Sequence, residues 1–115
     1  MSRVPRKIPV VFYRTPAGAE VVLDWLRSLE RADRNAIGQD LMRVQFRWPV
    51  GMPLCRPLGD GLWEVRTNLA GNKTARIFLC FADERIVVLH GFIKKTQKTP
   101  DTELRLAHKR KREFE

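Results

Sequence analysis

The chain has 115 residues, 43% hydrophobic and 30% charged, a balance typical of a globular protein that builds one core without disulfides. This length predicts a single domain over residues 1–115 and excludes an enzyme with separate cofactor and substrate domains. Lys and Arg outnumber Asp and Glu by 22 to 13, and the formal net charge of +9 indicates a polyanionic partner, either nucleic acid or an acidic protein. An anionic membrane is a third polyanion, but no apolar run is long enough to span a bilayer, and we expect no membrane partner.

The first half of the chain predicts one strand followed by two helices. Residues 8–14 are rich in β-branched and aromatic side chains, and Pro9 favours an edge position because proline cannot donate a hydrogen bond to a neighbouring strand. Thr15 and Pro16 form a cap and first-turn pair that predicts a helix start, and Asp33 predicts the cap of a second helix. The apolar residues at helical spacing in these helices are assigned to the core: Val22, Trp25, Leu26, Leu29, Ile37, Leu41, Val44 and Trp48.

The second half predicts three strands and a terminal helix. Residues 62–69 alternate between apolar and polar side chains, which is typical of a half-buried strand. Two more strands are expected over residues 76–82 and 85–93, and the short links between the three require an antiparallel meander. Thr99 and Pro100 then predict the start of the terminal helix. The expected class is α+β, in the order β-α-α-β-β-β-α.

We expect neither a targeting signal nor a metal site. The apolar run near the N-terminus is short and contains Pro9, unlike the hydrophobic region of a signal peptide. Cys80 lies in an apolar strand and is interpreted as a buried small hydrophobe. Two cysteines without metal-ligand spacing to His90 or His108 predict no zinc site and no cofactor, and they favour a reducing cytoplasm as the compartment.

The residues that carry many hydrolytic mechanisms are missing from the sequence. There is no phosphate-binding glycine loop and no pair of carboxylates that indicates a catalytic cleft. The two serines, Ser2 and Ser28, lie at the N-terminus and within a helical stripe, which argues against a serine triad. A conventional hydrolase is therefore not expected.

The remaining candidates for chemistry are cations in the last three strands. Arg66 lies on the polar face of residues 62–69, Arg76 begins the next strand, and His90 precedes the basic segment 94–98. Guanidinium groups pair bidentately with phosphate oxygens, and fixed cations stabilise the charge that grows when a phosphodiester is cleaved. In RNA the 2′-hydroxyl can supply the nucleophile, so the protein needs in-line geometry, charge stabilisation and a group that moves protons.

Each of these residues also has a structural interpretation. Arg66 or Arg76 could pair with Glu64 or with an acid on a neighbouring strand, and the register between the two arginines does not follow from the sequence. His90 could be a hydrogen-bonded histidine of the core, and residues 109–112 could be a solvated helix end. Pattern and composition alone therefore predict a basic α+β domain that binds a polyanion.

Two segments resemble the phage-derived branch of HigB-type toxins within the RelE superfamily of toxin–antitoxin systems. Residues 89–100, LHGFIKKTQKTP, are similar to the signature of this branch, and residues 58–66 match its L-x-x-G-L-W-E-x-R strand. Leu104, Ala107 and Arg110 match the pattern of its terminal helix. The resemblance covers nearly the whole chain.

This resemblance implies a RelE-like fold, in which helices pack on one face of a twisted antiparallel sheet and a terminal helix follows. It implies a metal-independent endoribonuclease that cleaves mRNA in the ribosomal A site by attack of the 2′-hydroxyl on the adjacent phosphate. The implied partner is a cognate antitoxin with a helix-turn-helix domain, and no small-molecule cofactor is implied.

The resemblance also assigns roles to individual residues. Arg66 falls at a basic position of the first meander strand, and Arg76 falls at the arginine that holds the scissile phosphate. Lys94 and Lys95 fall in the basic loop, as a second phosphate clamp. The residues expected to bind RNA outside this centre are Lys73, Lys98, Lys109 and Arg110.

The sequence departs from the family pattern at the proton-transfer group. Ala75 precedes Arg76 where other members carry an aromatic residue, and no tyrosine or histidine triplet lies near the C-terminus. His90 is our candidate for proton transfer because its ordinary pKa is near neutrality, with a lysine among residues 94–98 as the alternative. The rival function is a non-catalytic basic module that binds RNA or an acidic antitoxin. A DNA-binding regulator is disfavoured because no helix-turn-helix pattern is present.

Overall fold

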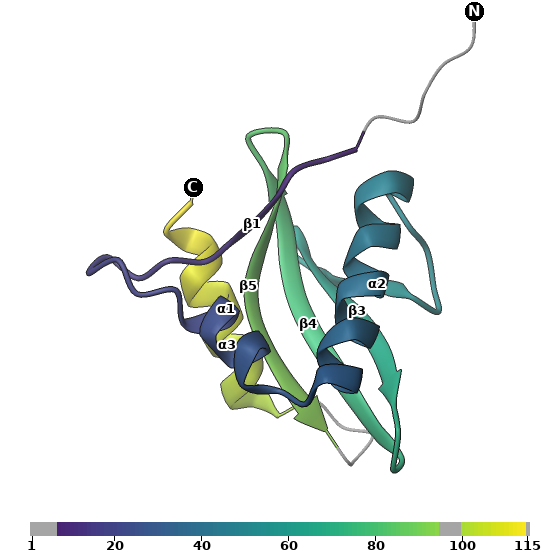
Figure 1. The fold of residues 1–115 in the computed structure, drawn as a ribbon. Helices are drawn as coiled ribbons and strands as arrows, with labels where there is room; N and C mark the ends of the chain where they lie inside the picture. Colours follow the sequence, from purple (N-terminus) through teal and green to yellow (C-terminus); the bar gives the residue numbers. More distant parts are fainter. Residues whose placement is uncertain (1–6, 95–99, 115) are drawn as a thin grey trace, which may run out of the picture.

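The computed structural model describes residues 7–94 and 100–114, which form a five-stranded sheet and three helices (Figure 1). The predicted α+β class is confirmed. Within these residues, no helix is both long and apolar enough to cross a membrane. The elements in chain order are β1 (Val10–Phe12), α1 (Val21–Ser28), α2 (Arg31–Arg47), β2 (Cys55–Gly59), β3 (Leu62–Leu69), β4 (Lys73–Ala82), β5 (Arg85–Lys94) and α3 (Asp101–Arg112).

The strands lie in the order β1-β5-β4-β3-β2, with the predicted meander β3-β4-β5 at the centre. β1 lies at one edge, as Pro9 predicted, and the Pro9 carbonyl accepts a hydrogen bond from the backbone N–H of Ile86 at 2.9 Å. β1 runs parallel to β5, with Val11 opposite Val87, so the expectation of a wholly antiparallel sheet is wrong at this pair. Two helices separate β1 from the rest of the sheet, and no tight turn dictates its direction.

Two predicted helix starts are wrong, and one strand was missed. Thr15 does not begin a helix: its Oγ1 accepts the Ala19 backbone N–H at 2.9 Å in a turn, and α1 begins at Val21. Asp33 lies inside the first turn of α2 rather than capping it, and it forms an ion pair with Lys73 at 3.5 Å. The missed strand is β2, whose sequence CRPLG contains a proline and a glycine and has no apolar alternation.

The two faces of the sheet bury different helices. α1 and α2 cover one face, and α2 lies in front of β3 and β4 in Figure 1. The predicted core positions Val22, Leu26, Ile37, Leu41 and Val44 are all buried there, while Trp25, Leu29 and Trp48 pack partly buried at its margin. α3 packs against the opposite face, where Ala107 and Leu104 contact a second cluster around Phe78.

Gly91 allows α1 to approach β5 closely. A Cβ atom at this position would collide with the ring of Trp25 and would lie 2.9 Å from Cδ1 of Ile77. We expect Gly91→Ala to lower the free energy of unfolding by about 1–3 kcal/mol, because the packed ring and strand have to move apart. Urea unfolding measures this change. Gly38→Ala, at a helical position where a Cβ meets nothing within 4 Å, is the control and should not destabilise the protein.

Candidate nucleic-acid interface

Strand register places three of the predicted cations on one face of the sheet. Arg66 on β3 lies directly opposite Arg76 on β4. Lys94 on β5 lies opposite Thr74, two positions from Arg76 along β4, so it shares that face because side chains alternate along a strand. The structure thus brings together Arg66, Arg76 and Lys94 on the side where α3 packs.

A buried carboxylate lies on the same face and contacts one of these cations. Glu64 is fully buried, and its Oε1 accepts a hydrogen bond from Arg76 Nη1 at 3.0 Å. The same oxygen lies 3.2 Å from Nη2 of Arg56, which comes from β2 and stands directly opposite Glu64. Sequence reasoning missed Arg56 because β2 was not predicted. Its only signal was a basic residue upstream of the L-x-x-G-L-W-E-x-R segment.

Arg66 and Arg76 differ in what their guanidinium groups contact. Arg76 is 3% exposed and is held by Glu64, which is the ion-pair interpretation weighed for it above. Arg66 is half-buried, and its side chain forms no hydrogen bond or ion pair with the residues that the structure describes. Arg66 is therefore available to a ligand, whereas Arg76 first has to share or leave its carboxylate.

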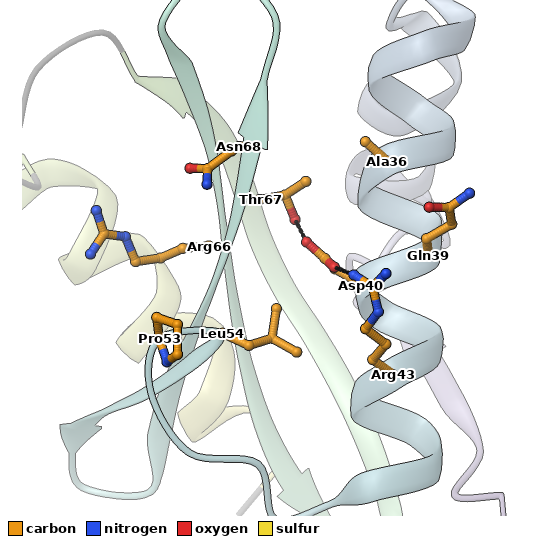
Figure 2. Close-up of a pocket in the computed structure, with 9 residues that line it drawn as sticks. All are labelled: Ala36, Gln39, Asp40, Arg43, Pro53, Leu54, Arg66, Thr67 and Asn68. Atoms are coloured by element: carbon orange, nitrogen blue, oxygen red, sulfur yellow. Dashed lines mark hydrogen bonds and ion pairs between the residues drawn. The ribbon is translucent and has the colours of Figure 1, made fainter.

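A cavity of about 570 Å³ lies beside Arg66, between α2 and β3 (Figure 2). Asp40 on α2 is buried there, accepts a hydrogen bond from Thr67 Oγ1 at 2.8 Å, and pairs with Arg43. Figure 2 shows Thr67 pointing toward α2 and Arg66 pointing to the other side of β3. The contacts of Asp40 join α2 to the strand that carries Arg66 and so support the position of that strand.

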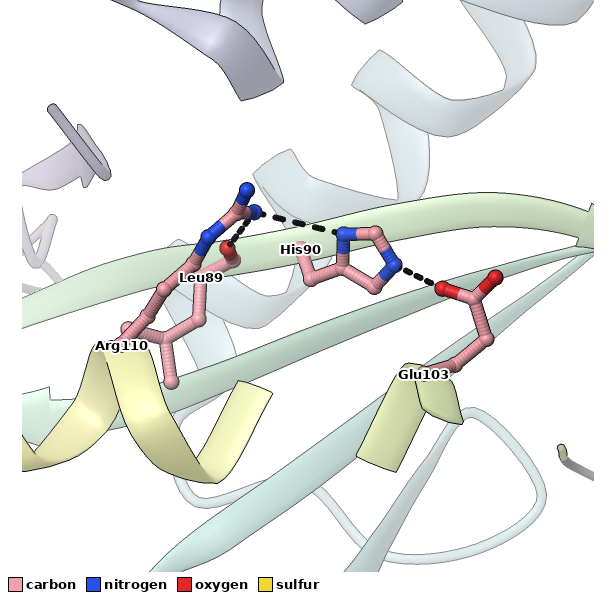
Figure 3. Close-up of polar contacts among 4 residues, drawn as sticks. All are labelled: Leu89, His90, Glu103 and Arg110. Atoms are coloured by element: carbon pink, nitrogen blue, oxygen red, sulfur yellow. Dashed lines mark hydrogen bonds and ion pairs between the residues drawn. The ribbon is translucent and has the colours of Figure 1, made fainter. Parts of the chain in front are cut away.

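His90 is held on both ring nitrogens by α3 (Figure 3). Nη1 of Arg110 donates to Nδ1 at 3.3 Å and to the Leu89 carbonyl at 2.8 Å, while Nε2 contacts the Glu103 carboxylate. Because arginine only donates, Nδ1 accepts, and Nε2 carries the proton that faces Glu103. The ring also stacks on Phe92 with 5.8 Å between centroids. These contacts are those of a histidine that joins β5 to α3.

The four residues expected to bind RNA outside this centre do not form one surface. Lys73 pairs with Asp33 of α2, on the sheet face opposite Arg66. Lys109 is exposed on α3, and Arg110 lies over the Tyr13 ring at 4.7 Å besides binding His90. Lys98, like the catalytic candidate Lys95, lies outside the described residues.

The thiols are poor nucleophiles in this fold. Cys55 on β2 is fully buried in the core cluster that α1 and α2 cover, and burial raises the pKa of its thiol to about 11. Cys80 is 2% exposed, as predicted for a small core hydrophobe. Among the described residues, no group of three or more His, Cys, Asp or Glu side chains is placed to hold a metal ion. The cations on the face that holds Arg66 and Arg76 are suited to binding an anion.

The fold and the site define the protein's class: a basic α+β domain in which two arginines, Arg66 and Arg76, lie opposite each other on neighbouring strands. Residues 24–112 match the sequence profile of the family described as phage derived protein Gp49-like (DUF891), and the chain belongs to this family. The family is associated with toxins of toxin–antitoxin systems of the RelE and HigB type, which implies an antitoxin partner. No curated protein matches the chain.

Proposed function

We propose that this protein is the toxin of a type II toxin–antitoxin system and acts as a ribosome-dependent mRNA endonuclease of the HigB branch. The observation that carries the proposal is the cross-strand pair of Arg66 and Arg76, with Lys94 on the same face. Family membership supports the toxin part of the proposal. We also propose that residues 1–115 act as one domain and that the antitoxin carries a helix-turn-helix motif.

In the proposed reaction, the 2′-oxygen of one nucleotide attacks the adjacent phosphorus while the P–O5′ bond breaks. The 2′-hydroxyl proton goes to a general base, and the departing 5′-oxygen takes up a proton to become a hydroxyl. Arg66 neutralises a non-bridging phosphate oxygen on which charge accumulates. Arg76 and Lys94, which are buried on the same face, add positive electrostatic potential at the phosphate. The products are a 2′,3′-cyclic phosphate and a 5′-hydroxyl.

The proton-transfer group in this proposal is His90, with Lys94 as the alternative. His90 has to release Glu103 or Arg110 before a ring nitrogen can reach RNA. Lys94 is 5% exposed and lies on the same face as Arg66. The pH profiles of cleavage by His90→Gln and by Lys94→Met distinguish the two, because only loss of the transferring group changes the profile.

A second candidate function is a basic module that binds RNA or the antitoxin without cutting. The observation that favours it is that the Arg76 guanidinium and both His90 nitrogens already have partners inside the protein. Such a module retains RNA with a salt-dependent affinity and leaves it intact.

Primer extension on a defined mRNA in a cell-free translation system tests the proposed function. We expect cuts in the presence of the purified protein and ribosomes. A ribosome-free arm with EDTA serves as the control, since ribosomes themselves need magnesium. Cuts in that arm would keep the nuclease and remove the ribosome from the mechanism, and intact mRNA in both arms would favour the binding module.

A further inference from the structure

We propose that Arg56 is a phosphate-binding residue of the same site, on a strand that the family resemblance did not include in it. The inference rests on the proposed function only in taking RNA as the ligand. β2 carries Arg56 onto the sheet face that holds Arg66 and Arg76, because Arg56 stands opposite Glu64. Arg66 lies two positions beyond Glu64 on β3, so the two arginines are diagonal neighbours, within reach of one phosphodiester.

Exposure separates the charged residues of this face into two layers. Glu64 and Arg76 are 0% and 3% exposed and form the lower layer. The Arg56 side chain is 39% exposed although its Nη2 contacts Glu64, so part of this side chain faces solvent. An approaching phosphate therefore meets Arg56 and the half-buried Arg66, while the carboxylate of Glu64 lies beneath them, out of reach.

The hydrogen bonds of Arg56 are incomplete. Its Nε is buried and has no hydrogen-bond partner among the described residues. A buried donor without a partner costs free energy, and such donors in native proteins need an explanation, a ligand being one. A small shift of the side chain toward a phosphate oxygen would give this donor a partner and complete the bidentate fork that arginine offers to phosphate.

The charges around Glu64 also support phosphate binding by Arg56. Among the described residues, the Glu64 carboxylate contacts two arginines, and these three side chains together carry one positive charge. If Glu64 served only to neutralise a structural arginine, Arg76 alone would suffice. The second arginine is located where the face opens to solvent.

The test measures binding without cleavage. The probe is a fluorescent single-stranded RNA in which every 2′-hydroxyl is methylated, so that the nucleophile is blocked. Affinity is measured over a range of salt concentrations for the wild-type protein, Arg56→Gln and Arg85→Gln. Arg85 is the matched control, because its side chain is 41% exposed and also contacts a carboxylate, that of Asp83 at 3.8 Å. Arg85 begins β5, at the end of this strand opposite to Lys94.

We expect Arg56→Gln to weaken binding about tenfold and to reduce the slope of log affinity against log salt by about 0.7, the value for one phosphate contact on a single strand. Arg85→Gln should change neither quantity. Arg56→Lys is the second variant: it should keep the slope and lose only part of the affinity, because the charge stays and the fork is lost. Thermal unfolding checks that each variant is folded.

An unchanged salt slope in folded Arg56→Gln would overturn the assignment of Arg56. So would equal losses in Arg56→Gln and Arg85→Gln, which would indicate a general effect of net charge. Failure of the wild-type protein to bind the probe would also overturn it. The cell-free cleavage assay decides the proposed function separately, since it uses unmodified mRNA and ribosomes.

Discussion

Replacing Glu64 with alanine should lower the free energy of unfolding by about 3–5 kcal/mol, the usual cost of leaving a buried charge without its partner. Glu64 is fully buried, and its Oε1 is the contact of both Arg76 and Arg56. Without the carboxylate, Arg76 keeps a desolvated positive charge 3% exposed, with Arg66 directly opposite on β3. Repulsion between the arginines adds to the loss of the ion pair.

Urea unfolding followed by tryptophan fluorescence measures this effect. Glu20→Ala is the matched control, because Glu20 also pairs with an arginine, Arg14, but at the surface. Surface pairs contribute about 0–1 kcal/mol, so the control should stay close to the wild-type protein. Similar stabilities for the two variants would show that the buried ion pair contributes no more than a surface pair.

Replacing Arg66 with alanine should reduce ribosome-dependent cleavage about 100-fold, the scale for loss of one fixed donor to transition-state charge. Arg66 is a sharper probe of the chemistry than Arg76. Its side chain has no hydrogen bond or ion pair to the described residues, whereas removal of Arg76 also disrupts the ion pair with Glu64. The Arg66 variant should therefore unfold at nearly the wild-type urea concentration.

Cleavage rates in the cell-free system give the size of the effect. Arg66→Lys is the conservative variant and should recover part of the rate, because a point charge replaces the bidentate fork. Arg85→Ala, at the far end of the sheet, should cleave at the wild-type rate. Wild-type cleavage by folded Arg66→Ala would remove Arg66 from the site and direct attention to Arg56.

The alternation of residues 62–69 was enough to predict that Glu64 and Arg66 share one face of β3. Their partners were harder to predict. Register across β3 and β4 depends on how many residues the turn takes up, and the structure pairs Leu69 with Lys73. A register shifted by one residue would have placed Arg76 on the face of α2 instead. The apolar helical stripes were reliable because burial alone decides them.

The burial of Glu64 could not be predicted because it depends on β2. Pro57 and Gly59 disfavour a strand in any local interpretation, yet an edge strand tolerates a proline whose missing N–H faces outward. Without β2, Glu64 was only a possible partner of Arg66 or Arg76 on the polar face of the strand, and Arg56 had no place in the site. The contacts of His90 with Glu103 and Arg110 on α3 could not be predicted either, because no spacing in the sequence indicates which residues of two distant elements come together.

The parallel pairing of β1 with β5 has a consequence for synthesis. Val11 finds its partner, Val87, only after β2, β3 and β4 between them have been translated. Closing so long a loop is slow compared with forming the hairpins β2-β3-β4, which join neighbours along the chain. A nascent chain can therefore form the hairpins that carry Arg56, Arg66 and Arg76 before β1 joins the sheet at its other edge.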